Sequence, residues 1–273
     1  RVKVIISHDV DHLFRDDHYR DLIYPKLWVR SSLELIKRKY SVREWFYRML
    51  TPFSEERHHI PDTIAFDRKN GIESTFFFGM ANGLGMSYSL ERAKDVIHYV
   101  LEQGFDVGVH GIAYNDEDKI KEEYERMKNI LGRENFGIRT HYVRFDGTTF
   151  PLFNQSGYLF DTSEFNKTKG CCFKPPYKIG DMWEFPLVIM DGYLPLKLDK
   201  KKLSTIELIK EAEKQDLPYL TILFHDYQFC KGYATEREWY KWLIGWLKAN
   251  DYQFISYKDA IVELERNAKD EKQ

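Results

Sequence analysis

Short apolar runs alternate along the chain with amphipathic segments, and each apolar run predicts a β-strand. The first, Val2–Ser7, is rich in β-branched residues and is bounded by polar ones. The strongest strand pattern is Tyr219–Phe224, with the sequence YLTILF. The other predicted strands are Ser74–Phe78, Asp106–His110, Gly137–Tyr142, the extended segment Trp183–Met190 and Gln253–Tyr257.

Helix signals fall between these strands. Ser89 is the expected N-cap of a helix whose apolar residues repeat with a period of 3.6 until Gly104 ends it. Ser204 with Glu207, and Thr235 with Glu238, form capping boxes that predict two further helices. The remaining predictions are helices over Asp116–Leu131 and Lys258–Arg266, with the two capped helices ending near Asp216 and at Asn250.

Repeated strand–helix units imply an α/β fold with parallel strands and helices packed outside them. About seven units favour a closed or nearly closed barrel, and a doubly wound open sheet is the alternative. We expect residues 1–273 to form one domain with a long insertion at about 13–72, which contains helix-like stretches at Leu27–Tyr40 and Val42–Leu50. The insertion either covers the mouth of the barrel and shapes substrate choice, or is an extra packing layer.

Polar side chains follow four of the predicted strands. In parallel barrels the chemistry lies at the carboxyl ends of the strands, so these residues are candidates for one site. The polarity of loops in general does not explain why histidine and aspartate recur at these points. The residues are Asp9 and Asp11, then His110, then Arg139, His141 and Tyr142, and finally His225 and Asp226.

Asp9 and Asp11 are two residues apart in an extended segment, so both side chains point the same way. Two carboxylates at one place repel unless they share a proton or face a cation, and a divalent metal resolves the conflict. The alternative is a pair of surface carboxylates, or one held by a helix N-terminus. His110 alone is more often a hydrogen-bonded core histidine, but beside carboxylates it suits zinc, with cobalt, manganese, nickel or iron as substitutes.

The order of five short motifs resembles the polysaccharide deacetylase family, carbohydrate esterase family 4. The motifs are SHDVDH, VHGIAYN, RTHY, FDTSEF and ILFHD. The variant form is similar to a subgroup associated with O-antigen and surface-polysaccharide assembly. The resemblance implies a distorted (β/α)-barrel and a hydrolase that removes acetyl groups from N-acetylated sugars with one metal held by an Asp and two His.

The resemblance also implies a role for individual residues. Asp9 would be the general base, held ionised by Arg139, and Asp11 and His110 would bind the metal. The backbone N–H of Tyr142 would donate to the oxyanion, and His225 would be the general acid. Asp161 or Glu164 would orient His225, and the other supporting residues would be Phe165 and Asp226.

The second motif departs from the family pattern. Where the family has a second histidine four residues after the first, this chain has Tyr114. His141 stands where the third motif usually has proline, so we expect that the missing ligand has moved to His141. The alternatives are His12, His58 and Asn115.

Composition excludes some functions and leaves others open. The net charge of −2 gives no case for nucleic-acid binding, and no apolar run approaches the length that spans a bilayer. Three cysteines and the absence of a signal-peptide pattern at Val2–Ser7 predict a cytoplasmic protein. Two alternatives remain: a related metallohydrolase that cleaves another C–N amide bond, and a degenerate member that only binds glycan.

Overall fold

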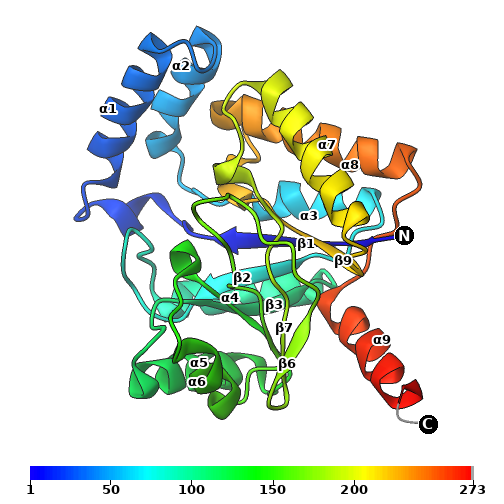
Figure 1. The fold of residues 1–273 in the computed structure, drawn as a ribbon. Coiled ribbons are helices and arrows are strands. Elements are labelled where there is room, and N and C mark those ends of the chain that lie inside the picture. Colours follow the sequence, from blue (N-terminus) through cyan, green and yellow to red (C-terminus); the bar gives the residue numbers. More distant parts are fainter. Residues whose placement is uncertain (272–273) are drawn as a thin grey trace.

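The computed structural model describes residues 1–271, and a curled, mostly parallel sheet runs through its centre (Figure 1). Among these residues the sheet has nine strands in the order β6-β7-β5-β4-β3-β2-β1-β9-β8. Neighbouring strands are parallel except β6 and β7, which are antiparallel. The strands are β1 (Lys3–Val10), β2 (Thr75–Gly79), β3 (Asp106–Gly111), β4 (Ile138–Thr140), β5 (Phe160–Asp161), β6 (Tyr177–Ile179), β7 (Met182–Glu184), β8 (Ile189–Met190) and β9 (Tyr219–Leu223).

Because the outermost strands of this order, β6 and β8, are not paired with each other, the sheet forms a half-barrel. The predicted α/β class and distorted (β/α)-barrel are confirmed. The sheet is more open than the closed or nearly closed barrel that was expected, and it has nine strands where about seven were predicted. Trp183–Met190 divides into β7 and β8, and the strand predicted over Gly137–Tyr142 is only the three residues of β4. Gln253–Tyr257 forms no named strand, because only Phe254 bridges to Val4.

Helices α3 to α8 pack around the outer face of the curled sheet. In Figure 1, α3, α7 and α8 cover one flank of that face, α5 and α6 cover the other, and α1 and α2 stand apart from the sheet as a pair. The bounds are α1 (Ile23–Ile36), α2 (Val42–Leu50), α3 (Ile60–Lys69), α4 (Leu90–Glu102), α5 (Glu117–Leu131), α6 (Thr149–Ser156), α7 (Leu198–Lys214), α8 (Ala234–Ala249) and α9 (Tyr257–Asp270).

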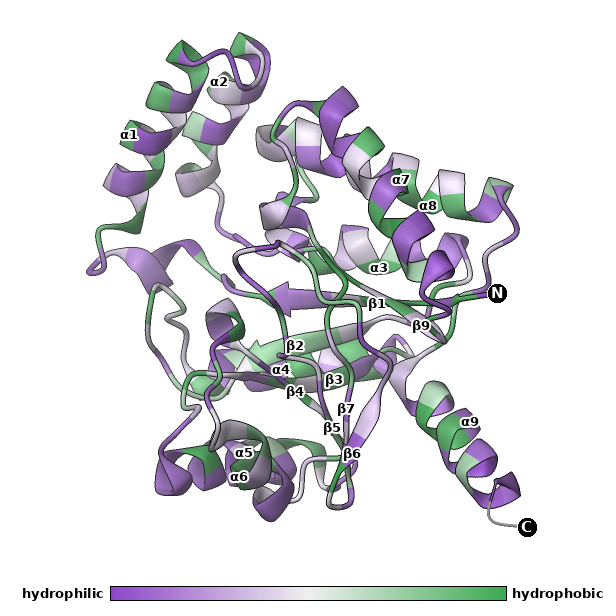
Figure 2. Ribbon diagram, in the orientation of Figure 1, coloured by the Kyte–Doolittle hydropathy of each residue, from purple (hydrophilic) through white to green (hydrophobic). Residues whose placement is uncertain are grey.

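Burial of the strands on both faces explains their continuous apolar runs. On the outer face, Phe76 of β2 packs with α4 and α5, and Ile6 of β1 packs with α7 and α8. On the inner face, Ile5 and Phe77 pack with Tyr257 of α9. Figure 2 shows the contrast along the sheet, because β2 is hydrophobic whereas the arrowhead of β1 is hydrophilic. The polar end of β1 therefore lies at the carboxyl edge of an otherwise apolar sheet.

Two predicted helix starts were wrong. Helix α7 begins at Leu198, six residues before Ser204, and its Thr205 hydroxyl bonds to the carbonyl of Lys201 inside the helix. Helix α8 begins before Thr235, whose hydroxyl donates to Glu44 of α2 rather than capping its own helix. For Thr235, a tertiary partner therefore takes the hydroxyl that a cap would use.

The segment between β1 and β2 contains a helix that the sequence pattern did not reveal. Helix α3 is the ordinary crossover between these parallel strands, with Ile60 and Ile64 in the core. Its buried Asp67 accepts hydrogen bonds from Ser74 and Tyr240 and lies 2.7 Å from His8 Nε2. The true insertion therefore lies between β1 and α3 and carries α1 and α2, so it is shorter than residues 13–72.

Candidate metal centre and active site

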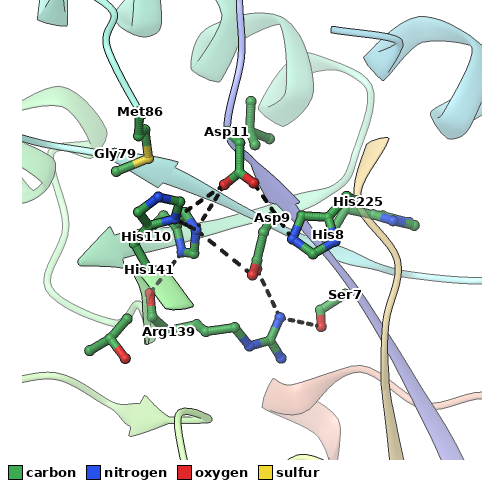
Figure 3. A network of polar contacts seen from close by, with 12 residues as sticks. Ser7, His8, Asp9, Asp11, Gly79, Met86, His110, Arg139, His141 and His225 are labelled. Atoms are coloured by element: carbon green, nitrogen blue, oxygen red, sulfur yellow. Dashed lines mark hydrogen bonds and ion pairs between the residues drawn. The ribbon is translucent and has the colours of Figure 1, made fainter. Parts of the chain in front are cut away.

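The carboxyl ends of β1, β3, β4 and β9 converge on one cavity of about 680 Å³. Strand pairing explains the convergence, because the register places His110 of β3 beside Arg139 of β4. The cavity is lined by Asp9, Asp11, His110, His141 and His225, among others. Figure 3 shows these side chains pointing toward one another from separate segments of the chain.

Asp11, His110 and His141 form a tight triangle of potential metal ligands. His110 Nε2 lies 3.1 Å from Asp11 Oδ1, and His141 Nδ1 lies 3.1 Å from His110 Nε2 and 3.5 Å from Asp11 Oδ1. Four ligands held tetrahedrally at about 2.0–2.1 Å from zinc are about 3.3 Å from one another. The triangle therefore has the dimensions of one face of a tetrahedral zinc site.

The backbone decides which nitrogen of each imidazole faces this triangle. His110 Nδ1 lies 2.9 Å from the carbonyl of Arg139, and His141 Nε2 lies 3.0 Å from the carbonyl of Leu84. A carbonyl only accepts, so these two nitrogens carry the protons of the neutral rings. The lone pairs of the other two nitrogens then converge with a carboxylate oxygen, and such outer hydrogen bonds are typical of metal-binding histidines. The donor set therefore fits a divalent cation.

The same surroundings keep Asp11 ionised. Burial alone would raise the pKa of Asp11. Without a cation, His110 and His141 in their protonated forms donate hydrogen bonds to Asp11 and, with the charge of His225, hold its pKa well below the ordinary value. An ionised carboxylate is the form that binds a metal.

The rival third ligands are engaged elsewhere. His12 Nδ1 lies 2.8 Å from His18 Nε2, and His58 Nδ1 accepts the N–H of Ile60. Asn115 hydrogen-bonds to Asp146. Of the candidates considered from the sequence, His141 alone joins Asp11 and His110 in the metal-ligand group found among residues 1–271.

Asp9 lies beside this triangle and is held by Arg139. Arg139 is fully buried, and its Nη1 donates to Asp9 Oδ1 at 2.9 Å and to Ser7 Oγ at 2.8 Å. Its other nitrogens reach Thr162 and Tyr257, so the guanidinium is satisfied on every side. The second carboxylate oxygen, Asp9 Oδ2, lies 3.8 Å from His110 Nε2 and is left to act toward the cavity.

His225 is oriented by Asp191, so the prediction that Asp161 or Glu164 does this was wrong. His225 Nδ1 lies 2.9 and 3.0 Å from the two oxygens of Asp191, which also accepts the backbone N–H of His225 at 2.8 Å. Burial alone would lower the pKa of His225, but the charge and hydrogen bond of Asp191, with Asp11 and Asp9, raise it to about 10. The other ring nitrogen, Nε2, lies 3.6 Å from Asp11 Oδ2 and faces the cavity.

Asp191 was missed although the sequence carried its signal. It directly follows the predicted extended segment Trp183–Met190, so the rule applied to four other strand ends would have found it. Asp161 instead bonds to Ser163 beside β5. Glu164 bonds to Lys174 and Tyr177 at a neighbouring groove of about 530 Å³.

The remaining supporting residues lie around the cavity rather than in it. Phe165 lines the neighbouring groove, and its ring lies 4.9 Å from that of Tyr193. Asp226 is buried and accepts the backbone N–H of His59, and burial raises its pKa to about 7. Neither side chain contacts His225 through a hydrogen bond in the described residues.

The backbone after β4 is strained. Tyr142 and Val143 have φ values of 59° and 44°, in the left-handed region that costs energy for residues other than glycine, and most for a β-branched one. The strained turn exposes the Tyr142 side chain at the cavity, where it is 59% exposed, and lines the same cavity with Val143. Strain of this kind is common at functional sites.

Comparison with solved structures identifies the fold. The chain superposes on a protein from Mycobacterium smegmatis assigned as a polysaccharide deacetylase, with a TM-score of 0.61, 17% identity and coverage of 97% of this chain and 90% of that one. A similar likeness holds for a Pseudomonas aeruginosa PAO1 protein with the same assignment, with a TM-score of 0.57, 11% identity and coverage of 94% and 88%.

The chain has the fold of the polysaccharide deacetylases. It is also similar to PuuE allantoinase, with a TM-score of 0.58, 14% identity and coverage of 94% of this chain and 87% of that one. No family model and no curated protein matches the sequence. Because proteins named for different reactions share this fold, the reaction has to be argued from the site.

Within residues 1–271, no helix combines the length and the apolar character that crossing a membrane requires.

Proposed function

We propose that this protein is a metal-dependent hydrolase that removes the acetyl group from an N-acetylated sugar. The observation that carries the proposal is the triangle of Asp11, His110 and His141, with an Arg139-bound Asp9 on one side and an Asp191-bound His225 on the other. A base and an acid on either side of a cation site are the parts that amide hydrolysis requires. A protein that only binds glycan needs neither of them.

Asp11, His110 and His141 would hold the metal, and zinc suits this donor set best. When bound, a divalent metal lowers the pKa of a water molecule and polarises the acetyl carbonyl. Asp9 Oδ2 takes the proton of the attacking water, because Oδ1 is occupied by Arg139. The guanidinium fixes the orientation of the carboxylate and balances its charge.

The remaining proton moves to the leaving group. The backbone N–H of Tyr142 donates to the carbonyl oxygen as negative charge develops on it, in the manner of an oxyanion hole. His225, held by Asp191 through Nδ1, donates its Nε2 proton to the sugar nitrogen as the C–N bond breaks. The products are acetate and a free amine.

The substrate is proposed to be a precursor or unit of a surface polysaccharide, of the O-antigen type. Support for this comes from the motif variant in which His141 replaces the usual proline and Tyr114 replaces the usual histidine. The Tyr114 ring packs under the guanidinium of Arg144 and lines the neighbouring groove, not the active-site cavity. A cytoplasmic location is part of the same proposal.

The test is acetate release from N-acetylated sugars by zinc-loaded wild-type protein and by Asp9→Asn. The matched control is Asp181→Asn, an exposed aspartate on the turn before β7. We expect release by wild type and Asp181→Asn, and a loss of about 10²–10⁴-fold in Asp9→Asn at unchanged metal content. Equal rates in Asp9→Asn and wild type would contradict the proposed base. Hydrolysis of a cyclic amide in place of every acetylated sugar would support the alternative C–N hydrolase.

A further inference from the structure

The helix pair α1–α2 is fastened to the body of the protein through α2. Arg48 Nε donates to the carbonyl of Gly232 at 2.7 Å, and the buried Glu44 accepts the Thr235 hydroxyl at 2.6 Å. Helix α1 lies outside α2, as Figure 1 shows, and the indole of Trp28 donates to the carbonyl of Met49. One side of α1 is therefore fixed in place while its other side faces solvent.

The free side of α1 is an apolar stripe. Val29, Leu33 and Ile36 are spaced four and three residues apart, so they share one face of the helix, and they are 63%, 53% and 76% exposed. Leu22, at the start of the helix, extends the stripe and is 64% exposed. In Figure 2 hydrophobic residues alternate with hydrophilic ones along the ribbon of α1. Large apolar side chains gathered on one exposed face mark an interaction surface.

The surroundings of the stripe are basic. Residues 22–53 contain seven Lys and Arg and two Asp and Glu, a net charge of +5, whereas the whole chain has −2, so the rest carries −7. Glu44 pairs with Arg48, and Glu34 lies between Arg30 at 3.2 Å and Arg48 at 3.6 Å. Lys37, Arg38 and Lys39 directly follow the end of α1, and the first two are exposed. This combination of an apolar stripe and a basic border matches an anionic membrane surface.

A second copy of this chain fits the same surface poorly. A symmetric dimer would place two stripes with the same +5 charge against each other, and like charges in an interface repel. A membrane with anionic headgroups supplies the opposite charge and an apolar layer at once.

The stripe also adjoins the active-site cavity. Lys26 and Arg30 line both that cavity and the apolar groove on α1, which is formed with Leu22, Val29 and Leu33. Two cations therefore stand between the place proposed for the sugar and the apolar face. A sugar joined by phosphate to a lipid has these three chemistries in the same order.

We propose that the outer face of α1 docks onto an anionic membrane surface, from which the enzyme takes an acetylated sugar carried on a lipid phosphate. The substrate class rests on the proposed deacetylase function, whereas the docking does not. Sugar enters the cavity, phosphate lies against Lys26 and Arg30, and the lipid remains in the bilayer.

The test is flotation of the 273-residue chain with vesicles of phosphatidylcholine alone and of phosphatidylcholine mixed with phosphatidylglycerol. We expect binding to the mixed vesicles that weakens at high salt, because surface charges are then screened. The variant Leu33→Ser/Ile36→Ser should bind more than roughly tenfold more weakly, since two apolar side chains no longer enter the membrane. The affinity of Lys37→Gln/Lys39→Gln for the mixed vesicles should fall roughly fivefold for each charge removed.

The matched control is Leu203→Ser/Val262→Ser, which removes two similarly exposed apolar side chains from α7 and α9 and should bind as wild type does. All variants should release acetate from a water-soluble substrate at the wild-type rate, since none of these residues lines the cavity. If none of the proteins releases acetate, the proposed deacetylase function is contradicted. The vesicle binding then still decides the docking proposal by itself.

Two results would overturn the docking. One is wild-type protein that ignores the mixed vesicles or binds them no better than Leu33→Ser/Ile36→Ser does. The other is a dimer in sedimentation equilibrium that Leu33→Ser/Ile36→Ser converts to monomer, which would assign the stripe to a second copy.

Discussion

Replacing Asp191 by asparagine tests whether His225 is the proton donor. Asp191 accepts the Nδ1 proton of His225 at 2.9–3.0 Å and fixes the ring so that Nε2 faces the cavity. Asparagine has nearly the same shape but no charge, and its amide group can turn a donor toward Nδ1. The ring would then lose both its orientation and the partner that stabilises its charged form.

The size of the effect follows from the bond that is lost. A hydrogen bond to a charged group is worth about 1.5–3 kcal/mol. If Asp191→Asn raises the activation free energy by about 2–3 kcal/mol, kcat should fall roughly 30- to 150-fold. The Michaelis constant should change little, because Asp191 is buried behind His225 and away from the bound sugar. Metal content should stay at the wild-type value, since Asp191 is not part of the ligand triangle.

The assay is steady-state acetate release by wild type, Asp191→Asn, His225→Ala and the double variant. If Asp191 acts through His225, adding Asp191→Asn to His225→Ala should cost almost nothing more. Asp161→Asn is the comparison variant, because its carboxylate was the first candidate for this role but bonds to Ser163 instead. Multiplicative losses in the double variant, or an unchanged kcat in Asp191→Asn, would refute the dyad.

Three further predictions concern the acid, the packing and the pH dependence. His225→Ala should keep its metal and lose about 10²–10⁴-fold in turnover, and retained turnover would remove it as the acid. Gly137→Ala should lose about 1–3 kcal/mol in denaturant unfolding, because its new Cβ would lie 2.2 Å from the Phe160 ring. Gly245→Ala, with open space in α8, should instead gain about 0.5–1 kcal/mol, and similar values for both glycines would contradict the packing argument. Burial lowers the pKa of His58 from 6.5 to about 4, so its neutral form favours the fold, and up to about 3 kcal/mol of stability should be lost as pH falls from 6.5 to 4. His58→Asn, which keeps an acceptor for the Ile60 N–H, should show a smaller loss in thermal melts over that range, and an identical pH dependence would count against the assignment.

Strand ends were the part of the site that the sequence predicted well. Asp9, Asp11, His110 and Arg139 meet because parallel strands bring their carboxyl ends to one edge, whatever the loops between them do. Asp191 follows the same rule, since it comes directly after the extended segment Trp183–Met190, but it was not among the predicted site residues. Its pairing with His225 depends on β8 lying beside β9. A local sequence pattern does not predict which strands are neighbours in the sheet.

The insertion shows the other limit of sequence patterns. Val42–Leu50 was predicted with its observed bounds, since Ser41 caps α2 and its side chain accepts the Glu44 N–H. Helix α3 was missed because its His59-Ile60-Pro61 start looks like a loop, although proline suits the first turn of a helix. The sequence alone does not predict which face of α1 points outward, because the apolar residues that stay exposed depend on where α2 packs.

The proposed function depends on one metal ion held by Asp11, His110 and His141. Elemental analysis of zinc-loaded wild-type protein beside Asp11→Asn, His110→Ala and His141→Ala tests it most directly, with His12→Ala as the matched histidine control. We expect about one metal per chain in wild type and His12→Ala, and loss of the metal in the other three. Full metal content in His141→Ala would contradict the relocated ligand, and no metal in any of the proteins would contradict the metal centre itself.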